Sequence, residues 1–125
     1  MRIIQVTPTE IIIDGIVPID EVPPLKKSGK PDDPNPIKRL CHKAKKELLK
    51  DPGVCIAYDV SPQIDNDEQI TKVTFFFSNT GKITIPPIDD EERLSREMDK
   101  YCQMMSARCA ELIEAYLLDL EFGNH

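Results

Sequence analysis

The feature that most constrains this chain is the stretch from Ile88 to Leu120, which contains neither Pro nor Gly. Two prolines come directly before it, and Asp89 and Glu92 have the spacing of a capping box, so the start of a helix is well specified. Apolar side chains then recur in steps of three and four, which places them on one face of a helix. They are Leu94, Met98, Tyr101, Met105, Cys109, Leu112, Tyr116 and Leu120. The stretch therefore predicts one long amphipathic helix, which Gly123 would end.

The length of this helix raises the question of what covers it. About thirty-two residues span about 48 Å, whereas a compact chain of this size has a diameter of about 35 Å. We expect the helix either to pair with a second copy in a homodimer or to break near Ser106 into two shorter helices. Its last turns are apolar on several sides, so we expect the dimer interface there. The candidate interface residues are Met105, Cys109, Leu112, Ile113, Tyr116, Leu117 and Leu120.

The composition predicts a single globular domain covering residues 1–125. The amino terminus has no signal-like apolar core, and no apolar run approaches the length of a membrane span. We therefore expect a cytoplasmic protein with no membrane contact. The four cysteines lack CxxC spacing, which predicts reduced and mostly buried thiols.

The first third of the chain predicts a hairpin followed by a connecting segment. Residues 2–6 and 10–13 are rich in Ile and Val and flank Thr7-Pro8-Thr9, as two short strands joined by a turn would. The three consecutive isoleucines at 11–13 fill both faces of their strand and so favour an inner position in the sheet. From 17 to 36, six prolines exclude a helix or a central strand. We expect this Pro-rich connecting segment to be partly mobile.

The middle of the chain predicts one more helix and the rest of the sheet. The helix lies between prolines, and the strands show an alternation of apolar and polar residues or follow a turn signal. We expect a helix at 37–50, strands at 54–60, 70–77 and 82–85, a polar loop at 61–69 and a hairpin turn at 78–81. The predicted fold class is α+β. An antiparallel sheet of about five strands, made of the N-terminal hairpin and a three-stranded meander, carries one short basic helix and one long C-terminal helix.

No combination of residues predicts catalysis or a cofactor. Gly81-Lys82 lacks the other residues of a phosphate-binding loop, and Asp65–Glu68 lacks the glycine that an EF-hand calcium loop requires. The cysteines and histidines do not have the spacing of a zinc site, and none of them lies in an activating context for nucleophilic attack. We therefore expect no catalytic residue, no metal and no cofactor, and enzyme activity is the less favoured interpretation.

The clearest functional signal is a split in charge. Residues 26–50 hold nine Lys or Arg and three acids, a net charge of +6, whereas the rest of the chain has seven against nineteen, a net charge of −12. One face of the predicted helix is basic, and it could bind the phosphates of a nucleic acid or an acidic protein. Its candidate binding residues are Lys38, Arg39, His42, Lys45, Lys46 and Lys50, with Lys26, Lys27 and Lys30 on the preceding segment.

Two observations limit the interpretation of this basic face. No aromatic residue lies among the cations, so stacking on single-stranded bases has no support. The cations could also be solvated, or paired with acids near the carboxyl end, of the same chain or a neighbouring one. Those acids are Glu111, Glu114, Asp119 and Glu121.

These observations predict a non-catalytic cytoplasmic interaction or regulatory protein. It would bind a macromolecular partner, of unknown identity, and dimerise through its C-terminal helix. The size and charge would fit a bacterial or phage accessory protein. One alternative is a nucleic-acid-binding module that uses the basic helix at 37–50, and another is a small-ligand-binding protein with a pocket between sheet and helices.

Overall fold

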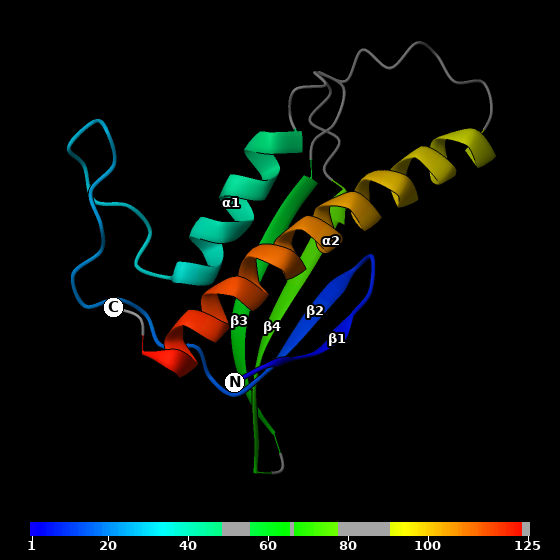
Figure 1. The fold of residues 1–125 in the computed structure, drawn as a ribbon. Helices are drawn as coiled ribbons and strands as arrows, with labels where there is room; N and C mark the ends of the chain where they lie inside the picture. The colour runs from blue at the N-terminus through cyan, green and yellow to red at the C-terminus, as the bar shows by residue number, and fades with distance from the viewer. Residues whose placement is uncertain (49–55, 66, 78–90, 124–125) are drawn as a thin grey trace.

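The computed structural model describes residues 1–48, 56–65, 67–77 and 91–123, and they form a sheet with two helices against one of its faces (Figure 1). The elements are β1 (Ile3–Val6), β2 (Glu10–Asp14), α1 (Pro36–Leu48), β3 (Ile56–Asp65), β4 (Glu68–Phe77) and α2 (Glu91–Phe122). All neighbouring strands are antiparallel, in the order β1-β2-β4-β3. The α+β class is as predicted, with four strands in these residues instead of about five. The strand expected at 82–85 lies outside the described residues.

The N-terminal hairpin agrees with the prediction. The Thr7 hydroxyl accepts a hydrogen bond from the Glu10 backbone N–H at 3.0 Å, which closes the turn between β1 and β2. β2 lies between β1 and β4, so the isoleucine run does occupy an inner strand. Ile11 lies beside Val73 of β4, which in turn lies beside Val60 of β3, and all three are buried. This row forms the floor on which the helices pack.

The β3–β4 hairpin differs from the prediction, because the loop expected at 61–69 is wrong. Strand pairing continues from Ile56 beside Phe77 to Asp65 beside Glu68. The reversal takes place around Asp67, whose φ of 68° lies in the left-handed region that Asp tolerates. The end of the hairpin projects beyond both helices (Figure 1), so its two faces meet water and its sequence lacks an apolar alternation.

The helix α1 begins where the sequence predicts. The Asn35 side-chain oxygen accepts hydrogen bonds from the backbone N–H groups of Ile37 at 2.9 Å and Lys38 at 3.4 Å, as a helix cap does. Pro36 occupies the first turn, where its missing N–H costs nothing. The helix packs against β3, and its apolar face enters the core.

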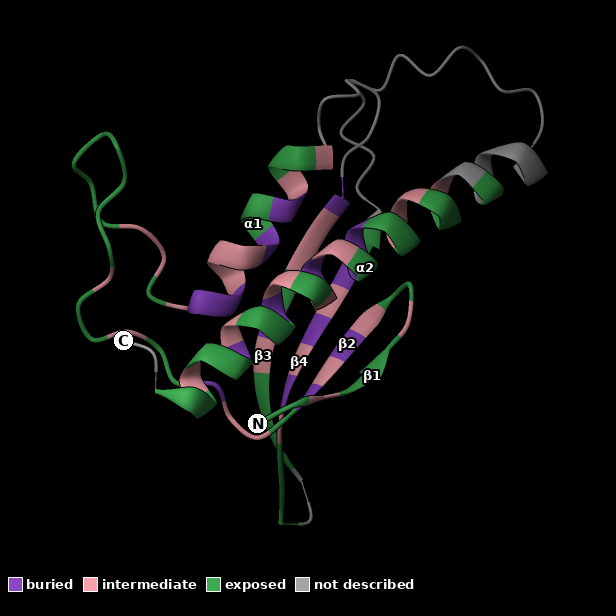
Figure 2. Ribbon diagram, viewed as in Figure 1, coloured by how far each residue is buried: buried purple, intermediate pink, exposed green. Residues whose placement is uncertain are grey.

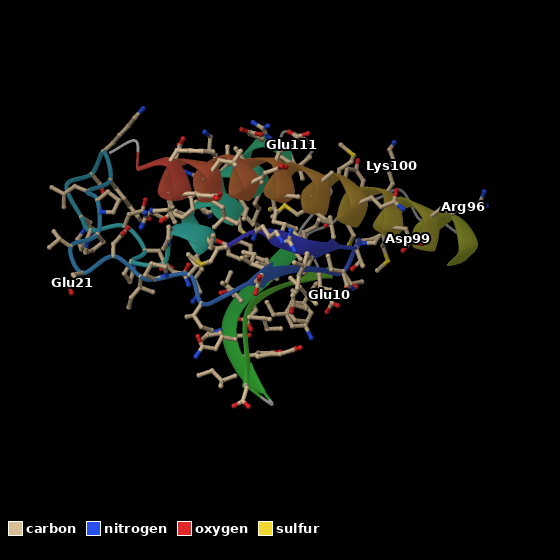
Figure 3. The ribbon with its side chains drawn as sticks, turned by 60° about the horizontal axis from the view of Figure 1, so that its bottom comes forward. Glu10, Glu21, Arg96, Asp99, Lys100 and Glu111 are labelled. Carbon is tan, nitrogen blue, oxygen red and sulfur yellow. The ribbon has the colours of Figure 1, made fainter. Side chains whose placement is uncertain are left out.

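The helix α2 is continuous, so the alternative of a break near Ser106 is not what the structure has. Ser106 is buried, and its hydroxyl donates a hydrogen bond of 2.6 Å to the backbone oxygen of Thr7 in the β1–β2 turn. The helix crosses β4, β2 and β1, and its amino-terminal part extends beyond the sheet (Figures 1 and 3). No helix in the described part of the chain is long and apolar enough to cross a membrane.

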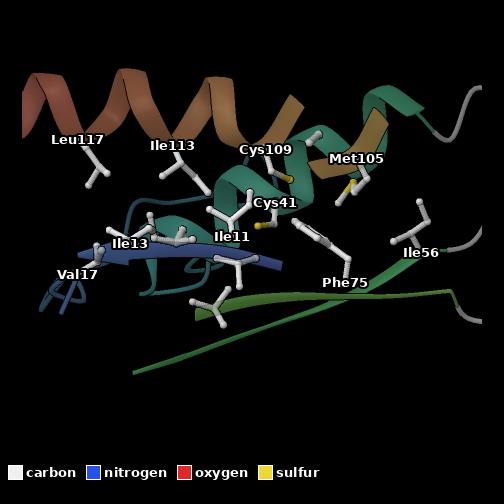
Figure 4. Close-up of a cluster of buried hydrophobic side chains, with 14 residues drawn as sticks. Ile11, Ile13, Val17, Cys41, Ile56, Phe75, Met105, Cys109, Ile113 and Leu117 are labelled. Atoms are coloured by element: carbon white, nitrogen blue, oxygen red, sulfur yellow. The ribbon is translucent and has the colours of Figure 1, made fainter. Parts of the chain in front are cut away.

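The core lies between the helices and one face of the sheet (Figures 2 and 4). Both helices and the three longer strands contribute to it, and so does the start of the Pro-rich segment. Its buried members are Ile11, Ile13, Val17, Ile37, Cys41, Ala44, Ile56, Val60, Val73, Phe75, Met105, Cys109, Ile113 and Leu117.

The Pro-rich segment is attached to the domain at both ends. At its start, the Val17 N–H donates to the Thr71 hydroxyl at 3.0 Å, and that hydroxyl donates to the Gly15 carbonyl at 2.9 Å. The Arg39 guanidinium of α1 donates to the Asp20 carboxylate, in the first part of the segment, and to the Asp33 carbonyl near its end, each at 2.7 Å. These contacts hold the segment against the amino-terminal end of α1.

Candidate interaction surfaces

The solvent-facing side of α1 carries a cluster of basic side chains, which we name the α1 basic surface. It consists of Lys38, His42, Lys43, Lys45 and Lys46. His42, Lys43 and Lys46 are exposed, and Lys38 and Lys45 are half-buried along the flank. The core side of the same helix carries Ile37, Cys41 and Ala44, so packing of that apolar side turns the cations outward. Lys50, a sequence candidate, lies outside the described residues.

Lys43 was missed by the sequence interpretation, although a signal for it exists. It lies four residues after Arg39 and three before Lys46, and such spacings place residues on the same side of a helix. The structure describes Lys43 as exposed. It therefore belongs with the predicted cations.

Arg39 has a different role from its neighbours. Its ion pair with Asp20, at 2.7 Å, and its bond to the Asp33 carbonyl join α1 to the Pro-rich segment. Within the described residues, no carboxylate lies within ion-pair distance of Lys38, Lys43, Lys45 or Lys46. The basic surface is therefore left with charges that the described part of the chain does not neutralise.

The expected pairing of the basic helix with the acidic end of α2 is not found among the described residues. The charged contact between the helices has the opposite polarity: Arg108 of α2 donates to Glu47 of α1 at 2.7 Å. Arg108 also bonds Glu111 of its own helix at 3.0 Å. Hydrogen bonds to Glu47 first, and then to Glu111, raise the pKa of Arg108 above its usual value, so this cation is fixed in its charged form.

A second group of cations lies on a turn that projects from the Pro-rich segment (Figure 1). The Lys26 N–H donates to the Lys30 carbonyl at 2.8 Å, and the Gly29 N–H donates to the Lys26 carbonyl at 2.9 Å. Gly29 has a φ of 83°, which an L side chain rarely adopts. This Lys26–Lys30 turn carries three exposed lysines, at 26, 27 and 30. Val22 and Leu25, just before it, are 87% and 71% exposed.

Four of the seven residues that we expected at the dimer interface lie inside the chain's own core (Figure 4). Met105, Cys109 and Ile113 are fully buried, and Leu117 is 4% exposed. Leu112, Tyr116 and Leu120 are partly buried and pack against the same core. The apolar stripe of α2 is covered by the sheet and by α1, so the four buried side chains offer no surface to a second copy.

One of the apolar residues that α2 leaves exposed, Leu118, lies elsewhere, beside β1. A groove of about 390 Å³ runs between that strand and the carboxyl-terminal half of the helix. Met1, Arg2, Ile3 and Val6 form its strand wall, and Ala110, Glu114, Leu117, Leu118 and Glu121 form its helix wall. We name it the β1–α2 groove. Sequence reasoning missed it because its walls are more than a hundred residues apart in the chain.

The cysteines of the core are protected thiols. Cys41 of α1 and Cys109 of α2 are free, fully buried and close to each other (Figure 4). A hydrogen bond with the Cys109 thiol, followed by burial, raises the pKa of Cys41 far above its usual value. Burial, and then the charge of Asp99, raises the pKa of Cys102. Thiols that stay protonated are poor nucleophiles and poor metal ligands.

The described residues also offer no group of side chains for binding a metal ion. No three His, Cys, Asp or Glu side chains among the described residues lie together as metal ligands would. Among the described residues, the two basic clusters and the β1–α2 groove are surface features that a partner could recognise. Comparisons with protein-family models, with curated proteins and with solved structures find no match to this chain.

Proposed function

We propose that the protein is a non-catalytic binding protein whose α1 basic surface and Lys26–Lys30 turn take up an acidic segment of a partner protein. The observation that carries this proposal is the set of lysines on α1 that have no carboxylate partner within the described residues. The chain has an excess of acids, yet those acids lie elsewhere. Unmatched like charges on one helix face repel one another, and an acidic partner would relieve that repulsion.

The extent of the surface favours a short acidic segment over a long polyanion. The thirteen residues of α1 span about 20 Å. Acids flank the cations, with Asp32 and Asp33 between the turn and the helix and Glu47 at the far end. These acids, together with the net charge of −6, would repel a phosphate backbone that continued past the cations. The surface also offers no aromatic ring on which a base could stack.

Charge alone would give only weak binding. An exposed ion pair contributes about 0.2–1 kcal/mol, so a few such pairs supply a few kcal/mol before the cost of association is counted. Val22 and Leu25, both largely exposed beside the Lys26–Lys30 turn, can add apolar contact. We therefore expect a partner segment in which acidic residues alternate with apolar ones.

We place this activity in the cytoplasm. Cys41, Cys102 and Cys109 are free, and a reducing compartment keeps thiols in that form.

The test measures binding of a fluorescent peptide of alternating Glu and Leu, and separately of duplex DNA, by anisotropy at low and high salt. We expect the peptide to bind more tightly than the DNA, with an affinity that falls as salt rises. The double variant Lys43→Glu/Lys46→Glu should abolish peptide binding, because it reverses two exposed charges at the centre of the α1 basic surface.

Lys100→Glu is the control, since it reverses one lysine charge on the exposed part of α2 that extends beyond the sheet (Figure 3). This variant should bind the peptide as the unchanged protein does. Tighter binding of DNA than of peptide would overturn the proposal in favour of nucleic acid. No binding of either probe, or an equal loss in both variants, would also overturn it.

A further inference from the structure

The strand β1 is an outer strand of the sheet whose chemistry leaves it open to pairing. It has a strand neighbour, β2, on one side only within the described residues. An outer strand presents unpaired N–H and C=O groups, which proteins commonly shield with Lys, Pro or other charged residues. β1 has the sequence Ile-Ile-Gln-Val and none of these. Ile4 and Val6 are 53% and 48% exposed.

Two features of β1 limit how much its pairing can contribute. The strand has four residues, and its register with β2 shifts between Ile3 and Gln5. Short strands and bulges are themselves protection against unwanted pairing. Backbone pairing at this edge would therefore need support from side chains, and the β1–α2 groove lies where that support is required.

The groove carries opposite charges on its two walls. Arg2 is on the strand wall, and Glu114 and Glu121 are on the helix wall. None of the three has an ion-pair partner within the described residues. In a two-fold symmetric contact, each copy offers the same surface to the other, so a surface that holds both signs of charge can match itself.

The direction of β1 relative to α2 brings these charges together. Thr7, at the end of β1, accepts a hydrogen bond from Ser106. The groove residues of α2 all follow Ser106 in the helix, so the strand runs antiparallel to α2 and its start lies near the carboxyl-terminal turns (Figure 1). Antiparallel pairing of two β1 strands centred near Ile4 places Arg2 of each copy beside Val6 of the other. Val6 lines the β1–α2 groove together with Glu114 of the helix wall.

We propose that the occupant of this edge is a second copy of the same chain. The two β1 strands pair antiparallel, the two sheets become continuous, and the two β1–α2 grooves close on each other. Arg2 of each copy meets the helix wall of the other, and Leu118, 46% exposed in one chain, becomes covered. This surface is separate from the α1 basic surface, so it does not depend on the function proposed above.

The first test compares one exposed isoleucine on each outer strand. Ile4 on β1 is 53% exposed and Ile64 on β3 is 74% exposed, so a lysine at either position is tolerated by the fold. Light scattering after size-exclusion chromatography should give the mass of two chains for the unchanged protein and for Ile64→Lys. Ile4→Lys should weaken association by on the order of tenfold or more.

The second test exchanges the charges of the groove. Arg2→Glu and Glu114→Arg should each weaken the dimer, and the double variant Arg2→Glu/Glu114→Arg should restore it. Circular dichroism and thermal unfolding of each variant establish that the chain remains folded. A monomeric unchanged protein, equal effects of Ile4→Lys and Ile64→Lys, or failure of the double variant to recover association would overturn the proposal.

Discussion

Within the described residues, the two outer strands of the sheet, β1 and β3, are protected in different ways. β3 is ten residues long and carries Asp59 and Pro62, both exposed, along its length. β1 has four residues, with no charge and no proline. A long edge offers many backbone groups and needs residues that interrupt pairing, whereas a short edge is protected mainly by its length. The difference indicates that self-association is to be sought at β1, where a groove can compensate for the short strand.

This comparison also bears on the apolar stripe of α2, from which the sequence predicted a dimer interface. The stripe lies over β4, β2 and β1 and fills the core beneath them. The residues available to a second copy are those at the margin of the helix, such as Leu118, which the stripe does not include. An interface next to an outer strand consequently depends on which side chains the core leaves exposed.

The largest effect on the free energy of unfolding is expected from a change in the buried stripe of α2. Ile113 is fully buried, so Ile113→Ala should lower the free energy of unfolding by about 2–5 kcal/mol, through lost burial and the cavity that remains. Urea denaturation followed by circular dichroism measures this loss. A chain that lost its dimer but kept its stability on this change would show that the α2 stripe is the interface after all.

A smaller effect is expected at the contact that joins the β1–β2 turn to α2. Ser106→Ala removes the hydrogen bond to the Thr7 carbonyl and leaves that oxygen without this donor, which should cost about 1–3 kcal/mol. Urea denaturation measures the cost, and hydrogen exchange should show faster exchange in the β1–β2 hairpin than in β3 and β4. Ala107→Ser, at an exposed neighbouring position, is the control and should leave both measurements nearly unchanged.

Much of this fold could be predicted because its signals are local. A proline marks the start of α1, three isoleucines mark β2 as an inner strand, and the apolar period marks α2. The extension of β3 and β4 past the helices could not be predicted in this way. Residues such as Gln63 and Ile64 are exposed there, so no core selects a pattern for them.

The candidate surfaces were only partly predictable, for a related reason. The cations of α1 follow from helical spacing, and Lys43 could have been included on that basis. The partner of Arg39, in contrast, depends on the path of the Pro-rich segment back to α1, which brings Asp20 within 2.7 Å. The β1–α2 groove depends in the same way on packing between the two ends of the chain, which sequence periodicity does not describe.

The stability of the protein should depend on pH through the buried thiol of Cys41, and not through the apolar residues of the core near β1. On the β3 side, Cys41 has a raised pKa, chiefly from its hydrogen bond with Cys109 and from burial, and burial also raises the pKa of Tyr58. A raised folded-state pKa means that the unfolded chain releases its proton first. The stability is therefore complete below the unfolded thiol pKa of about 8.5 and falls as the pH rises past it.

For a single thiol this fall is about 1 kcal/mol between about pH 8 and about pH 9.5. Urea midpoints across this range measure it. Cys41→Ala should reduce the slope and leave the part that the raised pKa of Cys102 contributes. Ile13→Val, an uncharged change in the core strand next to β1, should lower stability without changing the slope. A profile that kept its slope after Cys41→Ala would show that this thiol does not control the alkaline loss.

The smallest change in folding stability is expected when the residues that protect β3 are replaced. This change also tests most directly whether β1 and β3 are protected in different ways. Asp59→Thr/Pro62→Thr replaces two exposed edge residues with one that favours strands, and the free energy of unfolding should change by no more than about 0.5 kcal/mol. Association should nevertheless increase, because the long edge would then present an uninterrupted row of backbone groups. Light scattering at increasing protein concentration should show species larger than two chains, formed through β3 in addition to β1.

The control Gln63→Thr, which leaves both the charge and the proline in place, should remain a dimer. If the double variant also remained one, length and not these two residues would be what protects each edge, and the different chemistry of β1 and β3 would lose its meaning for self-association.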